Sequence, residues 1–166
     1  MAKRQRRAPD PGDFQDPLKN YDASVAEDEF EEALADNTVT DLQITPFKTV
    51  APATPLGDVV ALMAELDIGC VLITCPDGKL TGLFTQRDLL MSIVDDFDRL
   101  KDKPIGEVMT ADPVCVHETD NPATAINLMS VGGFRHVPVL DVDGRAVGLL
   151  GPRRMTAFLQ RYFPTK

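Results

Sequence analysis

The chain has 166 residues, of which 43% are hydrophobic, and a net charge of −9 at pH 7. This length suits one domain or two small ones that share a core, and no apolar run approaches the roughly eighteen residues of a membrane span. The acidic balance argues against a general nucleic-acid binder, because neutralising phosphates requires a basic surface.

The chain begins with a basic stretch, MAKRQRRAPD, that is not followed by an apolar segment. We therefore expect no secretory signal and a cytoplasmic protein. Residues 1–37 read as an acidic tail, and residues 1–26 have too few apolar side chains to order by themselves. Within the tail, EDEFEEALAD, residues 27–36, can form a short helix with Phe30 and Leu34 on one side. The cluster KRQRR could contact an acidic partner, although a solvated end is the simpler interpretation.

From Val39 onward the chain repeats itself at a constant offset of 66 residues, which indicates an internal duplication. CVLITCPDG, residues 70–78, aligns with HVPVLDVDG, residues 136–144. GLFTQRD, residues 82–88, aligns with GLLGPRR, residues 148–154. Few positions are identical, but hydrophobic character and turn placement coincide throughout. The hydrophobic frame is therefore kept, while a polar pair of the first copy is replaced in the second.

Each copy reads as strand, helix, strand, turn, strand and helix. Thr54 and Pro55 precede the apolar spacing of an amphipathic helix and are interpreted as its N-cap and first residue. Residues 70–74 are an apolar run too short for a helix, which predicts a buried strand. A Pro-Asp-Gly turn at 76–78 then leads into a second strand at 80–84.

The final helix of the first copy is predicted to start after Thr85 and to reach about Phe97. Residues 95–104 form a polar connection to the second copy, which follows the same order. Neither copy can bury a sizeable core alone. We therefore expect the two copies to pack sheet against sheet, with helices on the outside.

This order and duplication resemble the tandem cystathionine-β-synthase (CBS) domain pair, or Bateman module. The resemblance covers about residues 39–162, with CBS domain 1 at 39–98 and CBS domain 2 at 105–162. It implies an α/β (α+β) fold in which two βαββα motifs pack about a pseudo-twofold axis and leave two clefts. It also implies a homodimer formed through helical faces, and clefts that bind adenosine compounds such as AMP, ADP, ATP or S-adenosylmethionine.

The resemblance also assigns ligand contacts in one cleft. Asp88 would bind the ribose hydroxyls and Thr85 the ribose or phosphate, because a carboxylate can accept two hydrogen bonds from a cis-diol. Arg135 and His136 of the other copy would meet the phosphates. The adenine would lie against the same copy as Asp88, at Thr54, Val59, Ile68 and Cys70.

The reciprocal cleft lacks this pattern. Asp88 is replaced by Arg154 and Thr85 by Gly151, while Gly69 and Cys70 stand where the basic pair would be. We expect this cleft to be degenerate, or to bind an anion through Arg153 and Arg154.

Each of these residues also has a purely structural interpretation. Thr85 and Asp88 read as a capping box at a helix start, and Thr54 as a plain N-cap. Val59, Ile68 and Cys70 would be core residues in any version of this fold. The three cysteines and two histidines show no metal-ligand spacing, so we expect no zinc site.

The sequence contains no catalytic arrangement that we can defend, and no nucleotide-binding glycine loop. We therefore expect a non-enzymatic regulatory module that senses an adenine nucleotide or a related adenosyl ligand. Its signal would pass to an unknown target protein or through a homodimer. The alternative is a ligand-free interaction scaffold whose duplication serves only dimerisation.

Overall fold

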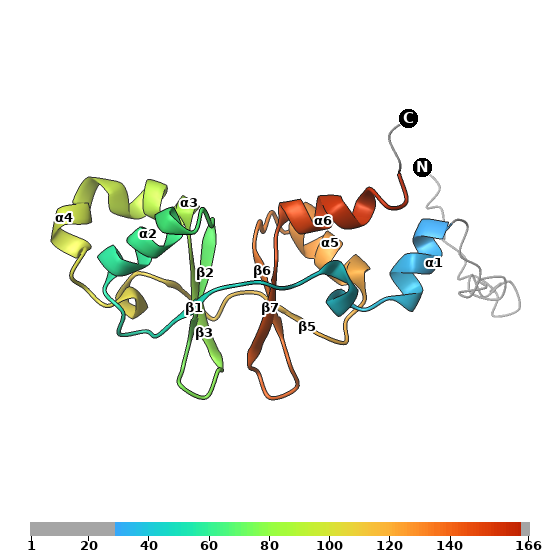
Figure 1. The fold of residues 1–166 in the computed structure, drawn as a ribbon, viewed down its shortest axis with the longest axis horizontal. Coiled ribbons are helices and arrows are strands. Elements are labelled where there is room, and N and C mark those ends of the chain that lie inside the picture. Colours follow the sequence, from blue (N-terminus) through green and yellow to red (C-terminus); the bar gives the residue numbers. More distant parts are fainter. Residues whose placement is uncertain (1–28, 164–166) are drawn as a thin grey trace, which may run out of the picture.

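The computed structural model describes residues 29–163, so the predicted disorder of residues 1–26 lies outside the described part of the chain. Two small sheets stand back to back at the centre of the molecule, and helices cover the outer side of each (Figure 1). The predicted α/β architecture is confirmed. The first sheet has the order β1 (Thr49–Val50), β2 (Cys70–Thr74), β3 (Leu80–Thr85) and β4 (Thr110–Ala111), and the second β5 (Val116–His117), β6 (Val137–Leu140) and β7 (Ala146–Leu150).

The helices follow the duplication. In the first copy these are α2 (Leu56–Glu65), α3 (Gln86–Asp88), a π-helical turn η3 (Leu89–Ile93), a 3₁₀ turn η4 (Val94–Asp96) and α4 (Phe97–Leu100). In the second copy they are α5 (Pro122–Ser130) and α6 (Pro152–Leu159), while the 3₁₀ turns η2 (Val39–Leu42) and η5 (Ile105–Glu107) begin the first and second copies. The segment 95–104 is not only a polar connection between the copies. Its residues Phe97 and Leu100 pack against the core of the first copy.

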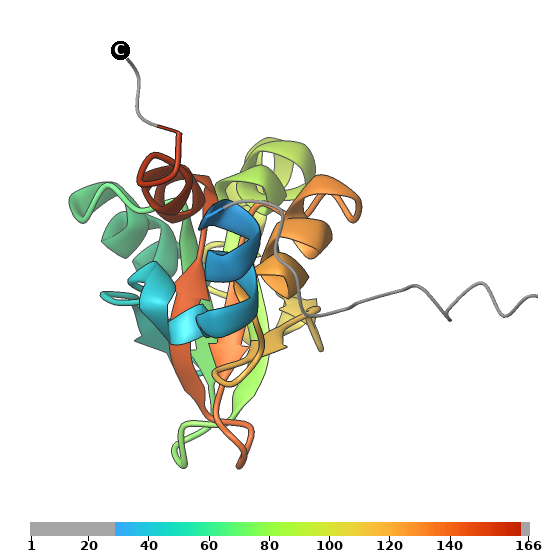
Figure 2. The same ribbon diagram turned by 90° about the vertical axis from the view of Figure 1, so that its right-hand side faces the viewer.

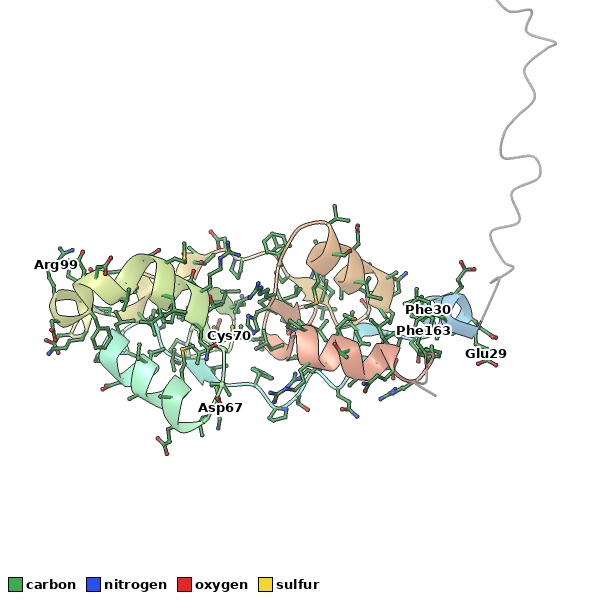
Figure 3. All side chains as sticks on the ribbon, turned by 90° about the horizontal axis from the view of Figure 1, so that it is seen from above. Glu29, Phe30, Asp67, Cys70, Arg99 and Phe163 are labelled. Carbon is green, nitrogen blue, oxygen red and sulfur yellow. The ribbon has the colours of Figure 1, made fainter. Side chains whose placement is uncertain are left out.

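Strand β2 is buried on both faces, which explains its continuous apolar run. Because side chains alternate along a strand, Val71 and Ile73 pack into the cluster beneath α2. Cys70 and Leu72 point the other way, into a cluster that includes Leu149 of β7. This second cluster is the contact between the two sheets, and Figure 3 shows Cys70 between the two halves of the molecule.

Two segments cross between the copies, and we call residues 39–48 and 105–114 the first and second crossing segments. Val39, Leu42 and Ile44 of the first crossing segment are buried in the core of the second copy. Ile105 of the second crossing segment is buried in the core of the first copy. The backbone of the first crossing segment also contacts the second copy, because Leu149 N donates to Ile44 O at 2.9 Å. Each copy therefore completes its core with residues from its twin.

The crossings account for the glycine that begins each of the two repeated stretches. A Cβ atom on Gly148 would lie 2.5 Å from Cβ of Ile44, and one on Gly82 would lie 2.4 Å from Sδ of Met109. Both distances are far below ordinary carbon contacts of about 3.5–4.0 Å. The hairpins of both copies thus need a residue without a side chain where the opposite crossing segment passes.

The start of α2 differs from the prediction. The helix begins at Leu56 with Pro55 in the N-cap position, and no side chain caps it. Thr54 instead offers its carbonyl to Ile105 N at 2.8 Å, so its backbone holds the second crossing segment. The N-cap interpretation of Thr54 was wrong, because Leu56 N and Gly57 N at the helix start donate to the carbonyl oxygens of Lys103 and Lys101, which lie far along the chain.

Helix α1 (Glu29–Asp36) covers the outer end of the second copy (Figure 2). Phe30 and Leu34 pack against that core, in line with their spacing of four residues. The Phe30 ring lies 5.7 Å from the Tyr162 ring and 5.2 Å from the Phe163 ring, between centroids. Acidic Glu29, Glu31 and Glu32 occupy the first turn of the helix. The helix is therefore attached by a narrow apolar edge.

Candidate functional site

Two cavities lie where the copies meet, and the offset of 66 residues relates their walls. The Asp88 cavity, of about 400 Å³, is lined by the start of the helical segment after β3, by the second crossing segment and by the approach to β6. The Arg154 cavity, of about 480 Å³, is lined by the equivalent parts with the copies exchanged. Gly69 and His136 line both cavities.

The Asp88 carboxylate is held in place by the helix start, as the capping-box reading predicted. Thr85 donates to Oδ2 of Asp88 from its backbone N at 2.8 Å and from its hydroxyl at 2.7 Å. The backbone N of Asp88 donates in return to the Thr85 hydroxyl at 3.3 Å. None of these hydrogen bonds involves Oδ1 of Asp88. The residue is half-buried on the cavity wall, so this oxygen can accept hydrogen bonds from a ligand.

The second copy supplies the wall of this cavity that carries Arg135 and His136. Burial lowers the pKa of His136, and the charge of Arg135 lowers it further, while Asp88 acts in the opposite direction. The imidazole is therefore neutral at pH 7 and serves as a hydrogen-bonding group. The guanidinium of the exposed Arg135 is the permanent positive charge on this wall.

The structure divides the eight residues named from sequence into three groups. Thr85, Asp88, Arg135 and His136 line one cavity. Ile68 and Cys70 line the Arg154 cavity instead, and Val59 of α2 is fully buried in the core of the first copy. Thr54 and Val59 are among the lining residues of neither interface cavity.

A planar ring bound beside Asp88 would therefore contact residues other than the expected Thr54, Val59, Ile68 and Cys70. Phe134, the repeat equivalent of Ile68, lines the Asp88 cavity, and so does Val114 of the second crossing segment. Both side chains are exposed. The offset of 66 would have identified Phe134 if the residues just before β6 had been assigned to the cleft that contains Asp88 of the other copy. Local sequence gives no such instruction, because the assignment depends on how the two sheets pack.

The interface contains one buried thiol, that of Cys70. Burial raises the pKa of the Cys70 thiol to about 12, with the charge of Asp88 adding to the effect, so the thiol stays protonated. Within residues 29–163, no three His, Cys, Asp or Glu side chains gather in a way that could hold a metal ion. Nor does any helix in that range have the length and apolar character to cross a membrane.

Comparison with known proteins gives a consistent picture. The family model described as "CBS domain" matches residues 39–95 and 105–161. The CBS domain-containing protein CBSCBSPB5 of Arabidopsis thaliana is 30% identical over 119 residues, which are 72% of this chain but 22% of that protein. An uncharacterised 17.7 kDa protein of Acidianus ambivalens is 25% identical over 121 residues, covering 73% of this chain and 72% of that protein.

Solved structures agree. The crystal structure of CBSX2 in complex with AMP matches with a TM-score of 0.67 and 27% identity, over 76% of this chain and 98% of that one. The CBS-domain containing protein ATU1752 of Agrobacterium tumefaciens matches with a TM-score of 0.65 and 26% identity, over 74% and 99%. The chain thus belongs to the CBS domain family and carries two CBS domains that pair as a Bateman module.

Proposed function

We propose that this protein is a regulatory, non-catalytic module that senses an adenine nucleotide or a related adenosyl ligand in the Asp88 cavity. The observation that carries the proposal is the meeting of Asp88 from the first copy and Arg135 from the second on one cavity. The complex of the similar protein CBSX2 with AMP supports an adenosine ligand. The cytoplasm remains the location that we predict for it.

The cavity offers each part of such a ligand a matching partner. Oδ1 of Asp88 accepts from the ribose diol, because the bonds from Thr85 hold the carboxylate by its other oxygen. The base lies against Val114 and Phe134, and the phosphates face Arg135, with His136 as a neutral hydrogen-bonding neighbour. AMP, ADP, ATP and S-adenosylmethionine all carry the ribose and base that these contacts recognise.

A ligand in this position touches both copies and the second crossing segment. It can change their relative arrangement only through a difference in its affinity for two arrangements. We propose that the change passes to a target protein or to a second copy of the chain. A homodimer is supported by the helical segment after β3, where Leu90, Met91 and Val94 form an apolar stripe that is 65%, 76% and 54% exposed.

The proposal is tested by thermal unfolding of the full chain with AMP, ADP, ATP and S-adenosylmethionine. A ligand at a hundred times its dissociation constant stabilises the folded state by about 2.7 kcal/mol, which is about 5–11 °C for a chain of this size. The decisive variant is Asp88→Asn, which keeps the shape but loses the charge and one acceptor. Its affinity should fall by about 10- to 100-fold, because hydrogen bonds to a charged group contribute about 1.5–3 kcal/mol.

Asn121→Ala is the matched control. The Asn121 side chain caps α5 by accepting from Thr124 N at 3.1 Å, and it lines neither interface cavity. Its loss should cost about 1 kcal/mol of stability and leave ligand affinity unchanged. If no adenosine compound raises the unfolding temperature of the wild-type chain, the nucleotide-sensing proposal is refuted, and the result favours the alternative function, a ligand-free dimerising scaffold.

A further inference from the structure

The Arg154 cavity has more basic than acidic side chains among its lining residues. Lys48, Arg153 and Arg154 line it, and Asp67 is its one acidic lining residue. None of the three cations forms an ion pair within residues 29–163. By contrast, the basic side chains of Arg99, Lys101, Lys103 and Arg145 each have a carboxylate within 4.0 Å. The Asp88 cavity is balanced, since its two arginines are matched by Asp88 and Asp112.

The same cavity has lost the groups that recognise a ribose. Arg154 stands in the place of Asp88, and its guanidinium donates to the carbonyl oxygens of Leu149 and Pro46. It thereby links the first crossing segment to β7 and offers a diol donors only. Gly151 stands in the place of Thr85 and has no hydroxyl. A nucleoside therefore finds neither of the polar contacts that the Asp88 cavity provides.

The remaining wall suits an organic group. Phe47, Leu66, Ile68 and Leu149 line the cavity beside the three cations. Pockets of a few hundred cubic ångströms with an apolar lining and a few polar groups are typical sites for small molecules. Lys48 and Arg153 are exposed and reach this volume from different elements, the first crossing segment and α6.

We infer that the Arg154 cavity is a second binding site, for a phosphate-bearing organic anion that is recognised without its ribose. The phosphate is held by Lys48 and Arg153 and by the donors of Arg154 that its two carbonyl partners leave unused. The apolar part of the ligand lies along Phe47 and Ile68. This site goes beyond the proposed nucleotide site and depends on none of its contacts. One chain thus holds two ligands of different chemistry on either side of His136.

The experiment is an amide chemical-shift titration of the isotope-labelled full chain with inorganic phosphate and with phenyl phosphate, at constant ionic strength. Phenyl phosphate should shift the amides of Lys48, Gly151 and Arg153, and it should bind several-fold more tightly than inorganic phosphate. Arg153→Ala and Lys48→Ala should each weaken phenyl phosphate binding by about tenfold, the value of one charge-assisted hydrogen bond. Arg154 is left unchanged, since its bonds to two carbonyls make it part of the fold.

The controls are Arg161→Ala and Lys79→Ala, which remove exposed cations outside both cavities. Both should bind phenyl phosphate as the wild-type chain does. Equal losses in the control and cavity variants would mean charge attraction without a site. Chemical-shift changes confined to Gly133 and Arg135 would place the anion in the Asp88 cavity. Equal affinity for phenyl phosphate and inorganic phosphate would show that the site does not recognise an organic group. Each of these results overturns the inference while leaving the test of the nucleotide site unaffected.

Discussion

Replacing Gly148 by alanine tests whether the crossing segments build the interface as described. The new Cβ would lie 2.5–2.7 Å from three side-chain atoms of Ile44, which is itself buried in the core of the second copy. The first crossing segment must therefore move by about 1 Å to restore contacts of about 3.5–4.0 Å. Overpacking of this kind costs about 1–3 kcal/mol. Weakening the bond from Leu149 N to Ile44 O adds about 1 kcal/mol.

The expected total of about 3 kcal/mol corresponds to a fall of about 6–12 °C in the unfolding temperature of a chain of this size. Thermal unfolding followed by circular dichroism measures it, with Gly151→Ala as the control. A Cβ at Gly151 would approach nothing closer than Cδ2 of His136 at 3.5 Å, an ordinary contact. The same displacement moves Lys48, so phenyl phosphate should also bind Gly148→Ala more weakly. If both variants unfold within about 1 °C of each other, the crossing is not as tight as the structure has it.

Two further predictions concern the pH dependence of stability and the surface of the proposed homodimer. Because burial and Arg135 hold the pKa of His136 below 6.5 in the folded state, the unfolded chain binds more protons as the pH falls through 6.5. Stability should therefore decrease from pH 7 toward pH 5.5, and His136→Gln should flatten that part of the profile in denaturant titrations. Met91→Asp places a charge in the exposed apolar stripe of the helical segment after β3. In sedimentation velocity it should turn the proposed homodimer into a monomer, and an unchanged sedimentation coefficient would exclude this surface as the contact.

Periodicity and turn chemistry were enough to predict most of the local elements. The apolar run at 70–74 is strand β2, and the hairpin after it turns at the predicted Pro-Asp-Gly. Thr85 caps the following helical segment as its spacing to Asp88 indicated. These features depend on neighbours a few residues away, so the sequence displays them directly. The constant offset of the duplication then made two similar sheets the natural arrangement.

The sequence was least informative about contacts across the duplication. Thr54 has the neighbours of an N-cap, but its carbonyl is used by Ile105, which lies far along the chain. Ile68 and Cys70 were assigned to the cleft of their own copy, although the packing of the sheets turns them toward the Arg154 cavity. A hydrophobic pattern reports that a residue is buried, and it does not report which copy buries it.

The polar pair and its replacement contact different groups on the two sides of the interface. At Asp88 the carboxylate accepts bonds from Thr85, which its own helix start supplies. At Arg154 the neighbouring groups are the carbonyl oxygens of Leu149 and Pro46, which need a donor. A carboxylate there would face two acceptors and leave them without partners, at about 1–3 kcal/mol for each one that is buried. Introducing the pattern of the first copy with Gly151→Thr and Arg154→Asp would therefore weaken the fold before it created a ribose site. Gly82 and Gly148, by contrast, are under the same constraint in both copies, because a crossing segment passes close to each of them.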